Sequence, residues 1–294
     1  MNGHEDLRIG TMVPNGKPEY LAQIVRHGFE SFEFNWWQHV GDVDFKKLAE
    51  DTRRVLDDAG TGAIVSCIGV YGNPLVDKQT AKDWARLIDA AKLFDCDLVV
   101  GFAGRVVDKP IPDSMKTFAK VFGPLAKRAA DKGVRLAFEN CDMGGTWQTG
   151  DWNIAHAPTA WEMIFDAIPS KNVGLEWEPC HQIGSLIDPL PQLRKYAHKV
   201  FHLHGKDATI LWDVVREFGI RSGKTFCHHR TPGFGDTNWT DIISILRMAK
   251  FKGAIDIEGW HDPVYRGDLE MTGQVHGLKY LQHCRGGDFV ENPK

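Results

Sequence analysis

The chain lacks the features that mark several large classes of protein. Its 294 residues carry a formal net charge of −4 and a sequence pI near 6.3, so it has no strong basic field to attract a nucleic-acid backbone. No apolar run approaches the roughly 18 residues that a membrane-spanning helix needs. The polar beginning MNGHEDLRIG is not typical of a signal peptide. We therefore expect a cytoplasmic protein that binds neither nucleic acid nor membranes.

Two short motifs are also missing. The six cysteines are spread along the chain without a CxxC pair, which argues against a zinc ribbon or a thioredoxin-like site. In a chain of this length, such cysteines are typical of reduced thiols in a cytosolic protein. The first predicted strand runs into RIGTMVPNG, which contains no GxGxxG, so a dinucleotide-binding open sheet is disfavoured.

What the chain has is a regular alternation of short apolar runs and helical patterns. The runs that predict strands are 7–13, 31–37, 63–71, 98–103, 134–140, 173–178, 200–204 and 253–260, and a further helix is predicted around 269–283. Such alternation implies a parallel sheet, and its length fits a (β/α)₈ barrel of about 250 residues. We predict an α/β fold, a single (β/α)₈ TIM-barrel domain over residues 1–294 with a C-terminal helical extension.

Polar side chains close four consecutive predicted strands in the second half of the chain. The strand ends read FEN (138–140), EWEPCH (176–181), HLHGKD (202–207) and DIEGWHD (256–262). Active sites of TIM barrels lie at the carboxyl ends of the strands. Because side chains alternate along a strand, Trp177, Leu203 and Ile257 are expected to face outward while the acidic and histidine side chains between them face the barrel axis.

A divalent metal ion is the simplest explanation for such a polar set. Several glutamates and a histidine are costly to bury together unless they share a positive charge. Carboxylate and imidazole donors suit Mn²⁺, Mg²⁺ or Co²⁺, with Zn²⁺ as a further alternative. Any one of these glutamates alone is more commonly a solvated residue of the rim, and Cys180 more commonly a packed thiol. We expect His202, one layer deeper than His204, to be a hydrogen-bonded core residue.

These residues resemble the xylose isomerase-like TIM-barrel superfamily, which contains sugar isomerases and epimerases, inosose dehydratases and abasic-site nucleases of the endonuclease IV type. The shared pattern is a Glu, an acid-x-x-His, a His and a Glu closing strands five to eight, here Glu139, Glu178-Pro-Cys-His181, His204 and Glu258. The resemblance implies one divalent ion, Mn²⁺ before Mg²⁺, Co²⁺ or Zn²⁺, bound by Glu139, Glu178, His204 and Glu258. Related chains usually have Asp in place of Glu178, and Glu176 is an alternative ligand.

The resemblance also implies a metal-dependent sugar isomerase or epimerase. Glu139 and Glu258 would remove and return a proton next to the carbonyl of a keto sugar or cyclitol, through an enediolate that the metal stabilises. His181 would hydrogen-bond a substrate oxygen. The further side chains expected to contact a sugar or glycoside substrate are Arg230, Lys206, His229 and Trp260.

Two other functions stay open. The first is a lyase, such as the large subunit of a C-glycoside deglycosidase, which acts on a 3-oxo-glycoside by β-elimination. The loop MGGTWQTGDWN fits it, because an indole can lie over a ring larger than a free pentose offers. The second is a catalytically inactive sugar-binding barrel, which predicts no bound metal. We expect a homo-oligomer, or a hetero-oligomer with a small subunit if the protein is a deglycosidase.

Overall fold

The computed structural model describes residues 4–293. Its parallel strands form a closed barrel in the order β1-β10-β7-β6-β5-β4-β3-β2, which confirms the predicted (β/α)₈ class. The barrel strands are β1 (Leu7–Pro14), β2 (Ser31–Trp37), β3 (Ile64–Tyr71), β4 (Leu98–Gly101), β5 (Arg135–Glu139), β6 (Val173–Trp177), β7 (Val200–Gly205) and β10 (Gly253–Ile257).

Helices alternate with these strands along the chain. They are α1 (Pro18–Ile24), α2 (Phe45–Ala59), α3 (Lys78–Ala90), α4 (Ile111–Asp131), α5 (Pro158–Ala167), α6 (Pro179–Gly184), α7 (Pro189–Tyr196), α8 (Trp212–Phe218), α9 (Trp239–Met248) and α10 (Glu270–Cys284). The last is the predicted C-terminal helical extension. None of the helices within residues 4–293 combines the length and the apolar character that crossing a bilayer requires.

Local signals in the sequence explain where several helices begin and end. The carboxylate of Asp44 accepts hydrogen bonds from the backbone N–H groups of Lys46 and Lys47 at the start of α2. The same helix ends at Gly60, whose φ of 63° lies in the left-handed region. A proline occupies the first turn of α1, α4, α5, α6 and α7, where its missing N–H costs nothing.

The chain divides into two compact units. Unit 1 comprises Met1–Thr11, Glu178–His198 and His204–Lys294, and unit 2 comprises Met12–Trp177 and Lys199–Leu203. Of the predicted metal ligands, Glu178, His204 and Glu258 thus belong to unit 1, whereas Glu139 belongs to unit 2. The assignment of residues 1–294 to a single domain stays a prediction.

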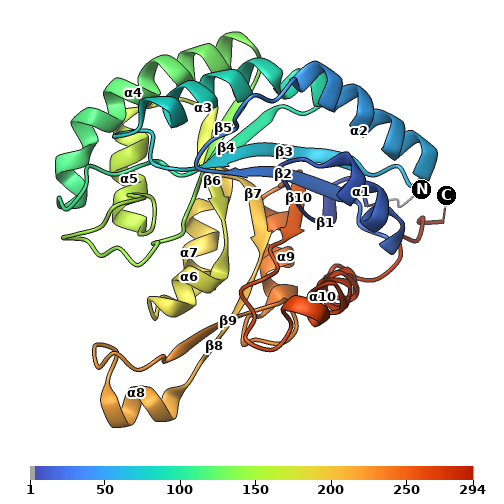
Figure 1. Cartoon of the computed structure of the whole chain (residues 1–294). Coiled ribbons are helices and arrows are strands. Elements are labelled where there is room, and N and C mark those ends of the chain that lie inside the picture. The colour runs from blue at the N-terminus through green and yellow to red at the C-terminus, as the bar shows by residue number, and fades with distance from the viewer. Residues whose placement is uncertain (1–3, 294) are drawn as a thin grey trace. The chain divides into compact units, whose positions relative to one another are not determined.

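Unit 2 is built on an aromatic core between its strands and helices. The helices α3, α4 and α5 lie side by side along the outside of β3, β4 and β5 (Figure 1). Between them, the ring of Phe122 lies 5.2 Å from Trp84 and 4.8 Å from Phe138, edge to face in both cases. Edge-to-face rings of this kind add to the stabilisation that their burial provides. This core supports the strands whose carboxyl ends carry polar residues.

Unit 1 combines the two strands β1 and β10 with helices α9 and α10. The strands pair in parallel, with Leu7 opposite Gly253 and Thr11 opposite Ile257. The Thr11 hydroxyl donates to the carbonyl of Ile257 over 3.0 Å. The side chains that fill the space under the helices are Trp239, Ile242 and Leu246 from α9 and Leu278 and Leu281 from α10.

The structure differs from the sequence-based prediction after β7. Residues Asp207–Ile210 form β8 and Cys227–Arg230 form β9, a two-stranded antiparallel sheet outside the barrel, with α8 between them (Figure 1). Asp207 thus begins a strand, and Lys206 lies between β7 and β8. Strands of four residues are too short for an alternating pattern to stand out, and α8 buries none of its residues.

Candidate active site at the strand ends

Three of the predicted metal ligands and a lysine come together in unit 1. Nδ1 of His204 lies 3.5 Å from Oε2 of Glu258. Nζ of Lys206 lies 2.9 Å from the same Glu258 oxygen and 3.9 Å from Oε2 of Glu178. These side chains are buried. The backbone N–H of Glu258 donates to the carbonyl of Gly205 over 3.3 Å, which holds the ends of β10 and β7 together.

The helix α6 brings Glu178 and His181 together. Glu178 is the residue immediately before α6, and Pro179 opens the helix. Residues three apart on a helical turn lie on the same side. Nε2 of His181 accordingly lies 2.8 Å from Oε1 of Glu178. The sequence Glu-Pro-Cys-His thus folds into a carboxylate–imidazole pair, which the spacing of the motif anticipated although the helix itself was not predicted.

The positive charge of Lys206 lowers the pKa of the two acids beside it. Burial alone would raise the pKa of Glu258, but Lys206, the hydrogen bond with His261 and the charge of His204 together outweigh it and lower that pKa to about 2. In the same way, burial raises the pKa of Glu178, while Lys206 and His181 hold it well below its usual range. Both groups are therefore carboxylates at neutral pH, which is the form that can bind a metal ion or accept a proton.

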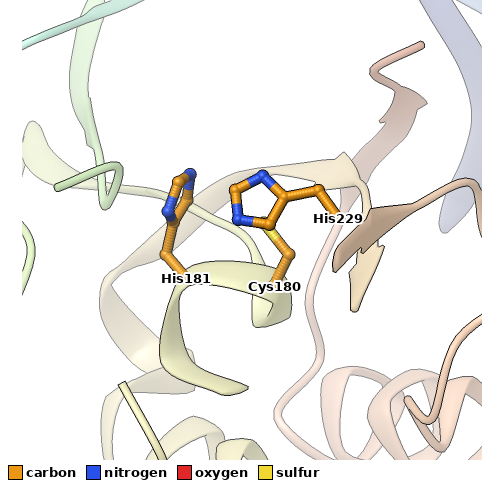
Figure 2. A group of neighbouring side chains, drawn as sticks. All are labelled: Cys180, His181 and His229. Carbon is orange, nitrogen blue, oxygen red and sulfur yellow. The ribbon is translucent and has the colours of Figure 1, made fainter. Parts of the chain in front are cut away.

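A second group of side chains that could hold a metal ion lies beside Glu178 in unit 1. Cys180, His181 and His229 place their donor atoms within 4.8 Å of one another (Figure 2). The rings of His181 and His229 lie 4.9 Å apart at 87°. Burial, with the charge of Lys206, lowers the pKa of His229 to about 3, so this imidazole is neutral. The Cys180 thiol is buried and donates to Glu178 over 3.3 Å, as expected of a packed thiol.

The remaining predicted substrate contacts lie on β9 and after β10. Nε of Arg230 donates to Oδ2 of Asp262 over 3.0 Å, and the same oxygen accepts the backbone N–H of Thr231. Trp260 is 37% exposed and its ring lies 6.0 Å from that of His261. Nε2 of His261 is 2.9 Å from Oε1 of Glu258. The structure thus fixes Arg230 by an ion pair and leaves the Trp260 ring partly open to solvent.

Glu139 ends β5 in unit 2, where the strand register places it in a polar row. It pairs with Glu176 of β6, and Glu176 pairs with His202 of β7. The backbone carbonyl of Glu139 accepts a hydrogen bond of 2.8 Å from Nδ2 of Asn153. The side chain is 4% exposed. Glu139 is therefore a buried carboxyl at a strand end, in line with the predicted position.

A buried network occupies the layer below in unit 2. The Tyr71 hydroxyl lies 2.5 Å from Oε1 of Glu33 and 2.8 Å from Oε2 of Glu176. Nδ1 of His202 lies 2.9 Å from the other oxygen of Glu176. This confirms that His202 is a hydrogen-bonded core residue. Both oxygens of Glu176 are therefore engaged in this network.

Sequence reasoning missed the roles of three side chains. Lys206 was expected only to contact substrate, and that contact stays a prediction, but its buried ammonium also lies beside the two acids Glu178 and Glu258. Tyr71 was not singled out, although its position at the end of β3 places it on the row of strand-end polar groups. His261, three residues after Glu258, could have been found from the same acid-x-x-His spacing that marked Glu178 and His181.

The donor set fits a hard or borderline divalent cation. Glu178 and Glu258 are buried carboxylates, His204 offers an imidazole nitrogen, and Lys206 supplies only one positive charge to two acids. The two acids thus keep a net negative charge that attracts a cation. Oxygen and imidazole donors without a coordinating thiolate are typical of Mn²⁺, Mg²⁺ and Co²⁺ sites, and Zn²⁺ also accepts such ligands.

Comparisons with known proteins point to the same superfamily. The chain is 26% identical over 182 residues to the inosose dehydratase of Clostridium tetani, a match that covers 60% of this chain and 57% of that enzyme. The chain thus spans about half the length of the curated relatives that it matches. Among solved structures, the 3-keto-D-glucoside 4-epimerase of E. coli is similar with a TM-score of 0.70 and 16% identity, covering 95% of this chain and all of the other (100%).

A magnesium-bound structure is also similar. It is a xylose isomerase-like TIM barrel protein from Mycobacterium smegmatis in complex with magnesium, with a TM-score of 0.70, 17% identity, and 95% and 97% of the two chains covered. At these identities, the likeness to solved structures concerns the fold. The model of one protein family matches residues 21–284. With that match over most of its length and a closed barrel whose strands end in buried acids and histidines, the chain belongs to the xylose isomerase-like TIM barrel family.

Proposed function

We propose that the protein is a divalent-metal-dependent isomerase or epimerase that removes and returns a proton next to the carbonyl of a keto sugar or cyclitol. The observation that carries the proposal is the buried group formed by Glu178, His204 and Glu258 around Lys206. Buried acids of this kind are costly without a cation. Membership of the family and the resemblance of the sequence motif to sugar isomerases support the same reaction.

The residues that would hold the metal are Glu139, Glu178, His204 and Glu258. Three belong to unit 1, and Glu139 is assigned to the set from its strand-end position and the family motif. Mn²⁺ is our first choice, because the donors are oxygen and imidazole. Once bound, a divalent ion would polarise the substrate carbonyl and make the neighbouring C–H more acidic.

The protein side chains would divide the proton transfers between them. Glu258 stays ionised because Lys206, His261 and His204 together offset its burial, so it can accept the proton from carbon. Glu139 would act from the other side of the reacting carbon. His181, held by Glu178 at 2.8 Å, would hydrogen-bond a substrate oxygen. A fixed geometry of this kind contributes to catalysis because the reacting groups need not be reoriented.

Four further side chains would bind the rest of the sugar. Arg230 is positioned by Asp262 and keeps guanidinium N–H groups to donate to hydroxyls. The neutral imidazole of His229 can donate or accept one hydrogen bond. Trp260 presents a partly exposed indole, and Lys206 would donate to a substrate oxygen beside Glu258.

A lyase is the second candidate function. The similarity to inosose dehydratase favours it, because that relative removes water. Elimination begins with the same proton abstraction and then expels a group from the next carbon. Lys206 could protonate such a leaving group, since its ammonium lies 2.9 Å from Glu258. A deglycosidase would need a small partner subunit, whereas an isomerase would need only copies of this chain.

Proton exchange in D₂O tests the proposal. Protein loaded with Mn²⁺ is incubated with a ketohexose, a keto-cyclitol and a 3-oxo-glycoside, and NMR follows deuterium entering next to the carbonyl. We expect exchange with at least one class, loss of exchange on chelation, and a fall of about 100-fold or more in Glu258→Gln. Glu19→Gln, which changes an exposed acid, is the matched control.

The product separates the two reactions. An epimerised or isomerised sugar supports the first proposal, and release of water or an aglycone supports the lyase. Absence of exchange with all three classes, or exchange that survives both chelation and Glu258→Gln, would contradict both. The expected cytoplasmic location and oligomeric assembly stay predictions that these experiments do not involve.

A further inference from the structure

A pocket in unit 2 is not used by the chemistry proposed above. Its volume is about 260 Å³, and it is lined by Gln38, Asn73, Val76, Asp77, Thr80, Asp151 and Trp152. It lies just beyond the carboxyl ends of β2 and β3, beside the loop that follows β5. Ligands of TIM barrels bind at this end of the strands. The volume suits one six-membered ring rather than a larger ligand.

Two tryptophans form a platform beside this pocket, which Trp152 lines and against which Trp37 packs through Trp152. The Trp37 and Trp152 rings lie 5.4 Å apart and are tilted by 34°. Trp37 is 56% exposed although it ends a barrel strand. Its ring rests edge to face on the buried Phe102, with centroids 6.3 Å apart. An indole held open to solvent at a strand end is a surface for the apolar face of a ring.

The loop that carries Trp152 is held firmly. The buried guanidinium of Arg105 donates to the carbonyls of Thr146, Trp147 and Lys109. On the other side of Trp152, the side chain of Asn153 donates to the carbonyls of Glu139 and Cys141, each over 2.8 Å. A platform fixed in this way loses little conformational freedom when a ligand binds. The Asn153 bond also ties it to the end of β5.

Polar groups beside the platform are available to a ligand. The backbone carbonyls of Gln38 and Asp151 accept hydrogen bonds from the side chains of Thr80 and Asn73, and among the residues that the structure describes no hydrogen bond involves their own side chains. Gln38 adopts φ 60°, a left-handed conformation that is uncommon for residues other than glycine. Strained residues of this kind concentrate at ligand sites. Amide and carboxylate groups are suitable partners for sugar hydroxyls.

The charges of the pocket limit what it can accept. Its lining contains Asp77 and Asp151 and neither lysine nor arginine, so a phosphate or carboxylate group would be repelled. A purely aromatic ring would leave the polar groups beside it without partners, which costs free energy. A neutral ring with hydroxyls on its edge and a flat apolar face satisfies both the indoles and the polar groups.

We propose that Trp37, Trp152 and Gln38 form a subsite for a second, non-reacting and uncharged sugar ring, so that the substrate is a disaccharide-like glycoside. The inference rests on the proposed function, since that function supplies the reacting sugar. It goes further by naming the class of substrate. The second ring is stacked on the tryptophans and hydrogen-bonded through Gln38 and Asp151.

Calorimetry with unreactive sugars tests this subsite. The metal-loaded protein is titrated with glucose and with maltose, cellobiose, laminaribiose and gentiobiose, which vary the linkage. We expect at least one disaccharide to bind about tenfold or more tightly than glucose, and Trp37→Ala and Trp152→Ala each to remove about tenfold of that gain. Trp212→Ala, which removes a tryptophan 49% exposed on α8, is the matched control and should change nothing.

Three outcomes would overturn the proposed subsite. The proposal is overturned if no disaccharide binds better than glucose, or if both tryptophan variants bind the disaccharide as tightly as the unmodified protein. A gain with phenyl glucoside but with no disaccharide would also overturn it, in favour of an aromatic occupant. If Trp152→Ala does not fold, binding is measured with Trp37→Ala, which changes an exposed residue, and with the conservative variant Trp152→Phe.

The outcome is separate from that of the proposed reaction. Calorimetry measures binding of sugars that lack the reactive ketone, so it needs no turnover. Disaccharide binding without deuterium exchange would leave the subsite standing and reject the isomerase. Exchange on a monosaccharide ketone without disaccharide binding would do the reverse.

Discussion

Nζ of Lys206 lies 2.9 Å from Oε2 of Glu258, and both side chains are buried. The pair joins the residue that follows β7 to the residue that follows β10. Together with His261 and His204, Lys206 keeps Glu258 ionised, whereas burial alone would favour the neutral acid. Lys206 also lies 3.9 Å from Glu178, so one ammonium serves two acids and leaves a net negative charge for a cation.

Replacing Lys206 by Met should destabilise the metal-free protein by about 3 kcal/mol, because it leaves buried carboxylates without their partner. Urea unfolding in the presence of a chelator measures the loss. Added Mn²⁺ should restore part of it, since a ligand that binds only the folded state stabilises that state.

The matched control for this variant is Lys127→Met. Lys127 pairs with Asp131 on the surface, where its side chain is 76% exposed, and such pairs contribute about 0 to 1 kcal/mol. A Lys206→Met protein as stable in chelator as the unmodified chain would show that Lys206 does not neutralise the acids.

Removing the hydroxyl of Tyr71 should also destabilise the fold. In Tyr71→Phe, Glu33 and Glu176 lose the group that lies between them, at an expected cost of about 2 kcal/mol. Burial, with the charges of Glu176 and Glu33, keeps the pKa of Tyr71 well above its usual range, so the hydroxyl is a donor. Thermal unfolding measures the change. Tyr265→Phe, which keeps the ring stacked on Phe234 at 4.0 Å, should be nearly neutral, and equal losses in the two variants would contradict the assignment.

Two glycines should respond to alanine in opposite directions. At Gly101, with φ +143°, a Cβ would lie 2.1 Å from the carbonyl oxygen of Val70, so Gly101→Ala should cost about 3 kcal/mol or prevent folding. At Gly123, inside α4, a Cβ would meet no atom within 4 Å, and alanine should stabilise the helix by about 0.5 to 1 kcal/mol. Denaturant unfolding of both variants checks the pair, and a stable Gly101→Ala protein would contradict the packing of β4 against β3.

The contribution of Asp262 should depend on pH. Burial alone would raise its pKa, but backbone N–H groups of Tyr265, Thr231 and Val264, together with Arg230, lower it. A lowered pKa in the folded state means stabilisation that is present above the unfolded value of about 3.9 and is lost as the pH falls through the folded value.

We therefore expect Asp262→Asn to lose about 2 kcal/mol at pH 7. The difference from the unmodified protein should shrink as the pH falls below about 4. Unfolding curves across the acid range measure it. A difference that does not change with pH would mean that the ionised carboxylate is not what stabilises this turn.

The sequence predicted the barrel because its signals are local. Apolar runs such as 63–71 and helix signals such as Asp44 and Gly60 each act within a few residues, and their alternation is sufficient to indicate parallel strands. The strand-end polar residues followed from the same order, since the carboxyl ends of parallel strands meet at one edge.

The remaining features depend on contacts between segments distant in sequence. Lys206 contacts Glu258, 52 residues away in the sequence, and Tyr71 contacts Glu176, 105 residues away. A periodic pattern in the sequence cannot predict such contacts. The antiparallel pair β8 and β9 is set by register between short strands, with Asp207 opposite Arg230. Its first residue is stabilised from outside, because Asp207 accepts the backbone N–H of Thr237.

The measurement that tests the central claim most directly is metal stoichiometry. The protein is stripped with chelator, dialysed against Mn²⁺ and then against metal-free buffer, and its metal content is determined by mass spectrometry alongside Glu178→Gln, His204→Ala and the surface control Glu19→Gln. We predict one ion per chain in the unmodified protein and the control, and a fall of at least tenfold in affinity in the other two. No retained ion in the unmodified protein, or equal retention in all four, would contradict a metal site at the ends of these strands.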